Sequence, residues 1–216
     1  MLEKMSDFFE KRLQGYDEHM LTEIESATLF YPFTAKQLPL EANSHILDLG
    51  CGTGLEIEAY CTLGGKAEFT GIDLSAKMLV ELKRKLPDYP IHLICDSYFD
   101  HDLGKAKYDA AVSVESLHHF TKEEKIPLYQ NLRVALKTNG YFILTDYFAM
   151  SEEEETLHRQ TFIALKQEQH ITDQDFYHYD TPLTVAHETE ALLMAGFSHV
   201  EILNHWGGTY TLKALK

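Results

Sequence analysis

Three glycines at alternate positions, Gly50, Gly52 and Gly54, follow a short apolar segment that contains Asp48. Glycines in this pattern let the backbone adopt positive φ angles and let a ligand approach it closely. The apolar-periodic segment that begins at Leu55 predicts a helix whose free N–H groups face the same turn. The turn is therefore suited to a nucleotide-like ligand, and the carboxylate of Asp48 favours a positively charged group there over a pyrophosphate.

Acidic residues also close the next two predicted strands. Asp73 ends the second strand, where a carboxylate can accept hydrogen bonds from both hydroxyls of a ribose. Leu74 and Met78 follow, and they either cover an adenine face or belong to the core. Asp96 ends the third strand and is either a ligand contact or a turn cap beside Ser97. The first three strands thus predict a single nucleoside site.

Two adjacent histidines, His118 and His119, follow the fourth predicted strand. Ligands lie at the carboxyl ends of the strands in an open parallel sheet, and the fourth strand is expected beside the first. Histidine titrates near neutral pH, so we predict His118 as a catalytic base, with His119 as the second candidate. Glu115 and Asp146 would suit a metal-dependent transfer, but neighbouring oxygen ligands are not evident, so no metal is expected.

The elements that must position these residues alternate as in an α/β fold. Strands are predicted at 45–49, 67–73, 91–96, 108–114 and 140–148, and helices at 55–63, 76–86, 122–136, 151–169 and 184–195. The turn before the fifth strand is placed at 137–140. The last two strands, 199–206 and 209–216, form an antiparallel pair joined at Gly207 and Gly208. The expected fold is a doubly wound, mostly parallel seven-stranded sheet with helices on both faces.

The N-terminal segment predicts two amphipathic helices ahead of the sheet. The first carries Phe8, Phe9 and Leu13 on one face, Gly15 interrupts, and the second runs from about Asp17 to about Tyr31. We expect these helices to cover the sheet as a lid.

Length and composition indicate one folded domain, 1–216, with a helical lid at 1–40, a cofactor-binding core at 44–147, and a substrate-shaping insertion with terminal strands at 151–216. A net charge of −15 argues against a large nucleic-acid footprint. The three cysteines fit neither a disulfide framework nor a C-x-x-C metal site. With no apolar run of membrane-spanning length and no signal-peptide pattern, we expect a cytoplasmic location, no membrane partner, and a homodimer as a possible assembly.

The segment D-L-G-C-G-T-G at 48–54 closely resembles motif I of the class I (seven-stranded) S-adenosylmethionine-dependent methyltransferases. The resemblance implies S-adenosyl-L-methionine as cofactor, an N-terminal Tyr-Asp segment that folds over it, and an acidic residue near the adenine amino group. It implies as cofactor-binding residues Tyr16, Asp48, Gly50, Cys51, Gly52, Gly54, Asp73, Leu74, Met78, Asp96, Ser97 and Glu115. The residues expected to contact a small-molecule substrate are His19, Tyr147, Tyr177 and His178.

The order of motifs, the aromatic insertion after the fifth strand and the A-G-F segment before the terminal hairpin are similar to the carboxy-S-adenosylmethionine synthase family, which serves tRNA modification. That family has S-L-G where Gly52, Thr53 and Gly54 stand here, and its insertion carries an arginine, whereas no arginine follows Arg159 in this chain. We therefore predict methyl transfer from S-adenosylmethionine to an oxygen, nitrogen or carboxylate of a small molecule. The alternatives are a carboxy-S-adenosylmethionine-type or tRNA-modification enzyme, a cofactor-binding regulator and, disfavoured by the glycine spacing, an NAD oxidoreductase.

Overall fold

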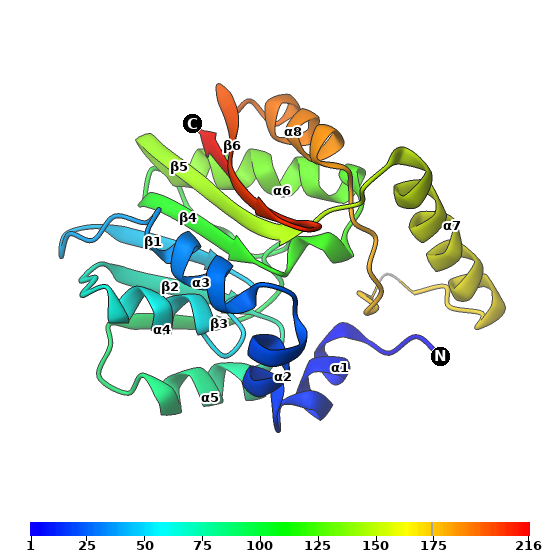
Figure 1. The fold of residues 1–216 in the computed structure, drawn as a ribbon, viewed down its shortest axis with the longest axis horizontal. Helices are drawn as coiled ribbons and strands as arrows, with labels where there is room; N and C mark the ends of the chain where they lie inside the picture. Colours follow the sequence, from blue (N-terminus) through cyan, green and yellow to red (C-terminus); the bar gives the residue numbers. More distant parts are fainter. Residues whose placement is uncertain (174) are drawn as a thin grey trace.

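The computed structural model describes residues 1–173 and 175–216, and it contains a seven-stranded sheet in the order β3-β2-β1-β4-β5-β7-β6 (Figure 1). The first five strands are parallel to one another, and β7 runs antiparallel to both β5 and β6. The predicted fold class is confirmed. The strands are β1 His45–Leu49, β2 Glu68–Asp73, β3 Ile91–Cys95, β4 Tyr108–Val114, β5 Leu136–Tyr147, β6 His199–Trp206 and β7 Thr209–Leu215.

Helices cover both faces of this sheet, and each face has its own apolar core. One core joins the sheet to α3, α4 and α5, and the other joins it to α6 and α8. The doubly wound arrangement places the carboxyl ends of β1, β2 and β4 at one edge. The helices are α1 Met5–Arg12, α2 Tyr16–Glu23, α3 Ala27–Ala35, α4 Leu55–Thr62, α5 Ala76–Lys85, α6 Lys122–Ala135, α7 Glu152–Glu168 and α8 Val185–Met194, with a 3-10 turn at Leu117–His119.

Several helices begin directly after a polar residue whose side chain caps the first turn. Ser75 and Thr184 each accept a backbone N–H from the first turn of their helix, at Met78 and His187 respectively. Ser151 accepts the N–H of Glu154, as in a capping box, but the Glu154 carboxylate accepts the N–H of Met150 instead of the N–H of Ser151. The predicted helix positions after the glycine turn are correct to within a residue or two.

The single N-terminal helix predicted from Asp17 to Tyr31 is wrong. The chain leaves helical geometry at Ile24, which is extended (φ −81°, ψ 121°), and Ser26 has a left-handed φ of 63°. The apolar periodicity continues across this break, which is why the pattern alone missed it. The result is two short helices, α2 and α3, of which α2 lies toward the open edge of the sheet and α3 packs on α4.

The turn predicted at 137–140 is absorbed into strand β5. β5 begins at Leu136, which pairs with Tyr108, and the register then shifts so that Ala110 pairs with Tyr141. The extra residues form a bulge at the strand entrance, far from the carboxyl end.

Helix α7 projects from the rest of the fold (Figure 1). None of its seventeen residues is buried. The chain then returns along the open edge of the sheet, where Tyr177 forms an isolated bridge with Lys4. Among the described residues, no helix combines the length and the apolarity that crossing a membrane requires.

Candidate cofactor cleft and acceptor cavity

The glycine turn links β1 to α4 with three left-handed residues. Gly50, Gly52 and Gly54 have φ angles of 80°, 47° and 79°. A Cβ at Gly50 would lie 2.1 Å from Ser116 Oγ, so any other residue there would displace the start of the segment that follows β4. The turn therefore requires glycine for both conformation and space.

Asp73, at the end of β2, is fixed against this turn. Its Oδ2 accepts the N–H of Gly52 at 2.9 Å, and its Oδ1 accepts the N–H of Ser75 at 2.7 Å. Burial raises the pKa of Asp73, while these two hydrogen bonds lower it. Each oxygen retains acceptor capacity, so the side chain is positioned to bind a pair of hydroxyls.

A narrow cleft of about 50 Å³ opens between the turn, Asp73 and the end of β4. Residues of the N-terminal helices α1 and α2, which we call the lid, form its cover. The lining residues are Met5, Phe9, Tyr16, Gly50, Gly52, Asp73, Leu74, Met78, Tyr98, Val114, Glu115, Ser116 and His119. Three of these residues, Met5, Phe9 and Tyr16, come from the lid.

Two further carboxyl groups are buried beneath the turn. Both oxygens of Asp48 and Oε1 of Glu56 have no hydrogen-bond partner among the described residues. Burial and the neighbouring Glu56 charge raise the pKa of Asp48 well above its usual range, and burial raises the pKa of Glu56 to about 7. Unsatisfied buried carboxyls are costly, so this pair is suited to a cationic group.

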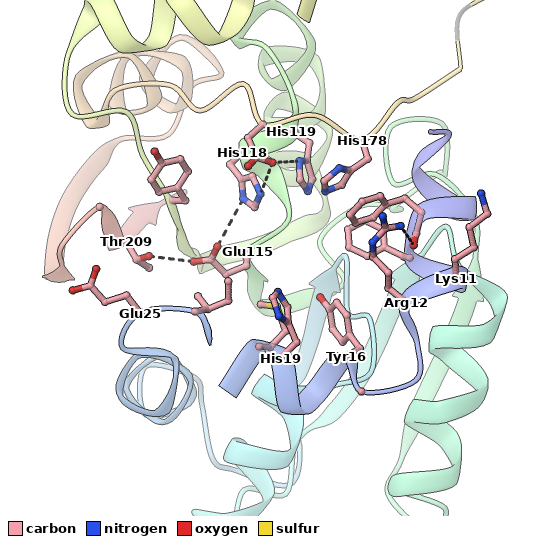
Figure 2. Close-up of a pocket in the computed structure, with 18 of the residues that line it drawn as sticks. Lys11, Arg12, Tyr16, His19, Glu25, Glu115, His118, His119, His178 and Thr209 are labelled. Atoms are coloured by element: carbon pink, nitrogen blue, oxygen red, sulfur yellow. Dashed lines mark hydrogen bonds and ion pairs between the residues drawn. The ribbon is translucent and has the colours of Figure 1, made fainter. Parts of the chain in front are cut away.

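A cavity of about 750 Å³ adjoins the cleft (Figure 2). His118, His119 and His178 lie along one side of it, and Tyr16 and His19 face them from α2. Tyr147, Trp206 and Thr209 contribute from β5, β6 and β7 respectively. Cleft and cavity share four lining residues: Phe9, Tyr16, Glu115 and His119. A ligand in the cleft and one in the cavity would therefore meet at these residues.

His118 is held by a buried carboxylate. Its Nδ1 donates to Asp146 Oδ1 at 2.5 Å, and Asp146 Oδ2 accepts the backbone N–H groups of Leu117 and His118. Burial lowers the pKa of His118, but the charge and hydrogen bond of Asp146 outweigh it and raise the pKa to about 9. The ring is thus fixed in orientation, with Nε2 toward Asp180 at 3.6 Å.

His119 has the opposite electrostatic character. Its Nδ1 lies 3.1 Å from Asp180 Oδ1. Burial and the charge of His118 lower the pKa of His119, and burial with the charge of His119 lowers the pKa of His178 to about 4. The cavity wall therefore contains one cationic histidine, His118, beside two neutral ones, His119 and His178.

Glu115 lies between the cleft and the histidines and has an unusual backbone. Its φ is 49°, a strained conformation for a residue with a side chain. Burial and the charge of Asp146 raise the pKa of Glu115 to about 8, and Thr209 Oγ1 donates to its Oε1 at 3.4 Å. Glu115 is thus a largely protonated acid at neutral pH, able to donate a hydrogen bond.

Residues 46–140, which contain the glycine turn, Asp73 and both histidines, match the methyltransferase domain family. The chain thus contains a methyltransferase domain, and its fold is the seven-stranded sheet predicted for the class I S-adenosylmethionine-dependent methyltransferases. A carboxy-S-adenosyl-L-methionine synthase of Wolinella succinogenes is 28% identical to this chain in an alignment 231 positions long, gaps included, which covers 96% of this chain and 92% of the relative.

Two other relatives show how far the similarity extends. A trans-aconitate 2-methyltransferase of Paracidovorax citrulli is 45% identical over 51 residues, so the aligned part is 24% of this methyltransferase and 20% of that relative. A solved S-adenosylmethionine dependent methyltransferase from Mesorhizobium loti superimposes with a TM-score of 0.63 at 22% identity, covering 86% of this chain and 96% of that chain. The strong identity is local, whereas the fold is shared nearly throughout.

The residues of this methyltransferase fit S-adenosylmethionine. The ligand carries a ribose, an adenine and two positive charges, at its ammonium and sulfonium groups. Asp73 is positioned for the ribose hydroxyls, Met78 and Leu74 line the cleft with apolar surface, and Asp48 has carboxylate oxygens without partners. A Cβ at Gly50 would fill the space between the glycine turn and Ser116.

Seven of the predicted cofactor residues of the methyltransferase line the cleft: Tyr16, Gly50, Gly52, Asp73, Leu74, Met78 and Glu115. The others lie behind or beside it. Asp48 is fully buried, the Cys51 sulfur packs on Gly71, and Gly54 packs on Leu82. Asp96 binds His101 at 3.0 Å, and its Oδ1 accepts the N–H of Ser97.

Three predicted substrate residues, His19, Tyr147 and His178, line the cavity. Tyr177 lies outside the lining, and its hydroxyl donates to Asp173 at 3.1 Å. Sequence reasoning missed Tyr98, Ser116 and Asp180. Ser116 directly follows Glu115 and could have been included for that reason, but no local pattern marks Asp180, which reaches the histidines only because Thr181 donates its N–H to the His118 carbonyl at 2.8 Å.

Proposed function

We propose that this protein transfers the methyl group of S-adenosylmethionine to a small-molecule acceptor. One observation carries the proposal: the cleft at the glycine turn and the histidine-lined cavity share Phe9, Tyr16, Glu115 and His119. A cofactor in the cleft therefore has its reactive end at the entrance to the cavity, where an acceptor can be held in line.

The bound cofactor supplies an electrophilic methyl group on a sulfonium. The protein must then exclude water, orient the acceptor and deal with the acceptor's proton. The lid and the apolar residues Phe9 and Trp206 enclose the cavity. The polar groups for the acceptor come from the histidines, Glu115 and Tyr147.

We propose His118 and His119 as the catalytic residues. His119 lies where the two spaces meet, and its Nδ1 faces Asp180, which leaves Nε2 to accept a proton. His118, oriented by Asp146, places positive charge beside the acceptor and so stabilises its deprotonated form. The order of importance proposed from the sequence, with His118 first, is thereby changed to His119 as base and His118 as electrostatic partner.

A carboxy-S-adenosylmethionine-type reaction is the second candidate, because the Wolinella relative aligns over nearly the whole chain. Carboxy-S-adenosylmethionine has one carboxylate more than S-adenosylmethionine, so this candidate requires a cationic side chain to pair with it. Arg12 lines the cavity, but it stacks on Phe8 and lies 3.2 Å from Glu3, so it is already engaged. The arrangement favours the plain methyl donor.

Calorimetric titration with S-adenosylmethionine, S-adenosylhomocysteine and NAD, followed by an acceptor screen, tests the proposal. We expect the adenosyl ligands to bind and Asp73→Ala to weaken them, because the variant removes the carboxylate that faces the ribose. Binding of NAD alone, or of no ligand, would contradict the assignment. Tight cofactor binding without turnover across a broad panel of acceptors would favour a regulatory role.

We further propose that the protein acts in the cytoplasm on small molecules rather than on nucleic acid. The net charge of −15 supports this, since binding to phosphates requires clustered basic residues. Light scattering of the purified chain tests the predicted homodimer.

A further inference from the structure

Three potential metal ligands from two distant segments converge on the wall of the acceptor cavity. His118 Nε2 lies 3.6 Å and His119 Nδ1 lies 3.1 Å from the same atom, Asp180 Oδ1. The two imidazole rings have centroids 4.0 Å apart. Figure 2 shows both rings on the side of the cavity that faces the lid.

We propose that His118 Nε2, His119 Nδ1 and Asp180 Oδ1 form a binding site for a divalent transition-metal ion. The inference rests on the proposed function, because it specifies how the two histidines act on the acceptor. It also departs from the expectation, drawn from the sequence, that the protein holds no metal.

The spacing suits a small ion. Bonds of about 2.0–2.1 Å at a tetrahedral centre place neighbouring ligand atoms about 3.3 Å apart. The distances from Asp180 Oδ1 to His119 Nδ1 and to His118 Nε2, 3.1 and 3.6 Å, lie on either side of that value. All three ligand atoms lie within 4.8 Å of one another, so small movements of the Asp180 side chain, which is 46% exposed, together with small rotations of the two rings would bring them to bonding distance.

The surroundings of His118 support metal binding more directly. A metal-bound histidine usually donates its other ring N–H to a carboxylate, which fixes the tautomer. Asp146 accepts that hydrogen bond from Nδ1 at 2.5 Å and is itself held by the N–H groups of Leu117 and His118. The lone pair on His118 Nε2 is thereby the one that a metal would use.

A second group of potential ligands, Glu115, His118 and Asp146, fits less well. It would use His118 Nδ1, and the Asp146 oxygens already accept hydrogen bonds from three backbone N–H groups and from the His118 ring. Asp146 therefore serves to position His118 and is not the ligand we propose.

Two histidines and one carboxylate leave coordination positions open, and here those positions face the cavity. An acceptor with an oxygen donor would complete the coordination. Once bound, the ion would take over both roles given to the histidines above. Its positive charge would replace that of the His118 proton, and the acceptor would bind as its anion with its proton released to water, while His119 Nε2 keeps its own proton. Imidazole ligands favour Zn²⁺, Co²⁺ or Fe²⁺ over Mg²⁺.

Metal binding is tested on the full chain after treatment with a chelator, by dialysis against Zn²⁺ or Co²⁺ and metal analysis. We expect one ion per chain and a visible Co²⁺ spectrum typical of low coordination number. Asp180→Asn should weaken the affinity at least tenfold, and Asp146→Asn should weaken it roughly 10- to 100-fold. His19→Ala, which changes another histidine of the same cavity, should bind as the wild type does.

A wild-type chain that binds well under one equivalent, or an Asp180→Asn variant that binds like His19→Ala, would overturn the proposal. Acetate, a carboxylate small enough for the cavity, should shift the Co²⁺ spectrum if a coordination position is open, and an unchanged spectrum would contradict that position. The cofactor titration on the same metal-free sample separates the two proposals, since S-adenosylhomocysteine binding does not require the metal.

Discussion

The cofactor cleft and the acceptor cavity share a wall but are built in different ways. Apart from Tyr16 of the lid, the polar groups of the cleft come from one contiguous stretch of the chain, residues 50–119. The cavity combines the lid, the segment after β4, the insertion that carries His178 and Asp180, and the terminal hairpin. On the function proposed above, residues fixed by a local turn would bind a cofactor that many enzymes share, whereas residues gathered from distant segments would determine the acceptor.

The sharpest test of the cleft is Gly50→Ala. The new Cβ would lie 2.1 Å from Ser116 Oγ at a φ of 80°. A left-handed backbone alone costs roughly 1–2 kcal/mol, and with the collision we expect cofactor affinity to fall roughly 100-fold. Calorimetry measures the loss. Gly64→Ala is the matched control, because Gly64 has a similar φ of 75° but open space around it. Equal losses of cofactor affinity in both variants would mean that the glycine turn at Gly50 does not contact the ligand.

The corresponding test of the cavity is His119→Ala. With an acceptor from the screen, we expect kcat to fall by about 100-fold, a typical contribution of a general base. Affinity for S-adenosylhomocysteine, measured by calorimetry, should remain within a few-fold because the glycine turn and Asp73 are untouched. A variant that loses cofactor affinity but keeps kcat would reverse the roles given to the two regions.

Asp17 connects the two regions, because it ties the lid to the glycine turn. Its Oδ1 accepts from Thr53 Oγ1 at 2.5 Å, and its Oδ2 accepts from Lys85 Nζ at 2.6 Å. Hydrogen bonds to charged groups contribute about 1.5–3 kcal/mol, so Asp17→Ala should weaken cofactor binding roughly tenfold by favouring an open lid. Limited proteolysis should then cleave the lid faster. Glu18→Ala, at the next and exposed position, is the control.

The smallest effect expected is on stability, at Glu56. Its pKa rises from 4.5 to about 7 in the folded protein because of burial. Between these values the native state binds more protons than the unfolded state, so Glu56 makes the protein less stable as the pH rises from 4.5 to 7. We therefore compare the free energy of unfolding of Glu56→Gln with that of the wild type. This difference should favour the variant by on the order of 1 kcal/mol more at pH 8 than at pH 5. Urea unfolding at both values measures this, and a difference independent of pH would contradict it.

The contrast between features built from neighbouring residues and features assembled from distant segments also explains which predictions from the sequence were correct. The positions of the strands and helices and the glycine turn follow from local periodicity and turn chemistry, which act over a few residues. The break at Ser26 was missed because apolar spacing continues through it. Asp180 was missed for another reason: it reaches His119 across sixty residues of chain, and only tertiary packing brings them together.

Helix α7 buries none of its residues, yet it leads into the segment that delivers His178 and Asp180 to the cavity. Most destabilising substitutions act by disturbing buried groups. Changes at the exposed positions of α7 therefore carry little thermodynamic penalty, and mutations can accumulate there without unfolding the domain. Selection for a new acceptor can thus act on this part of the chain while the cofactor half, with its packed turn, stays constant.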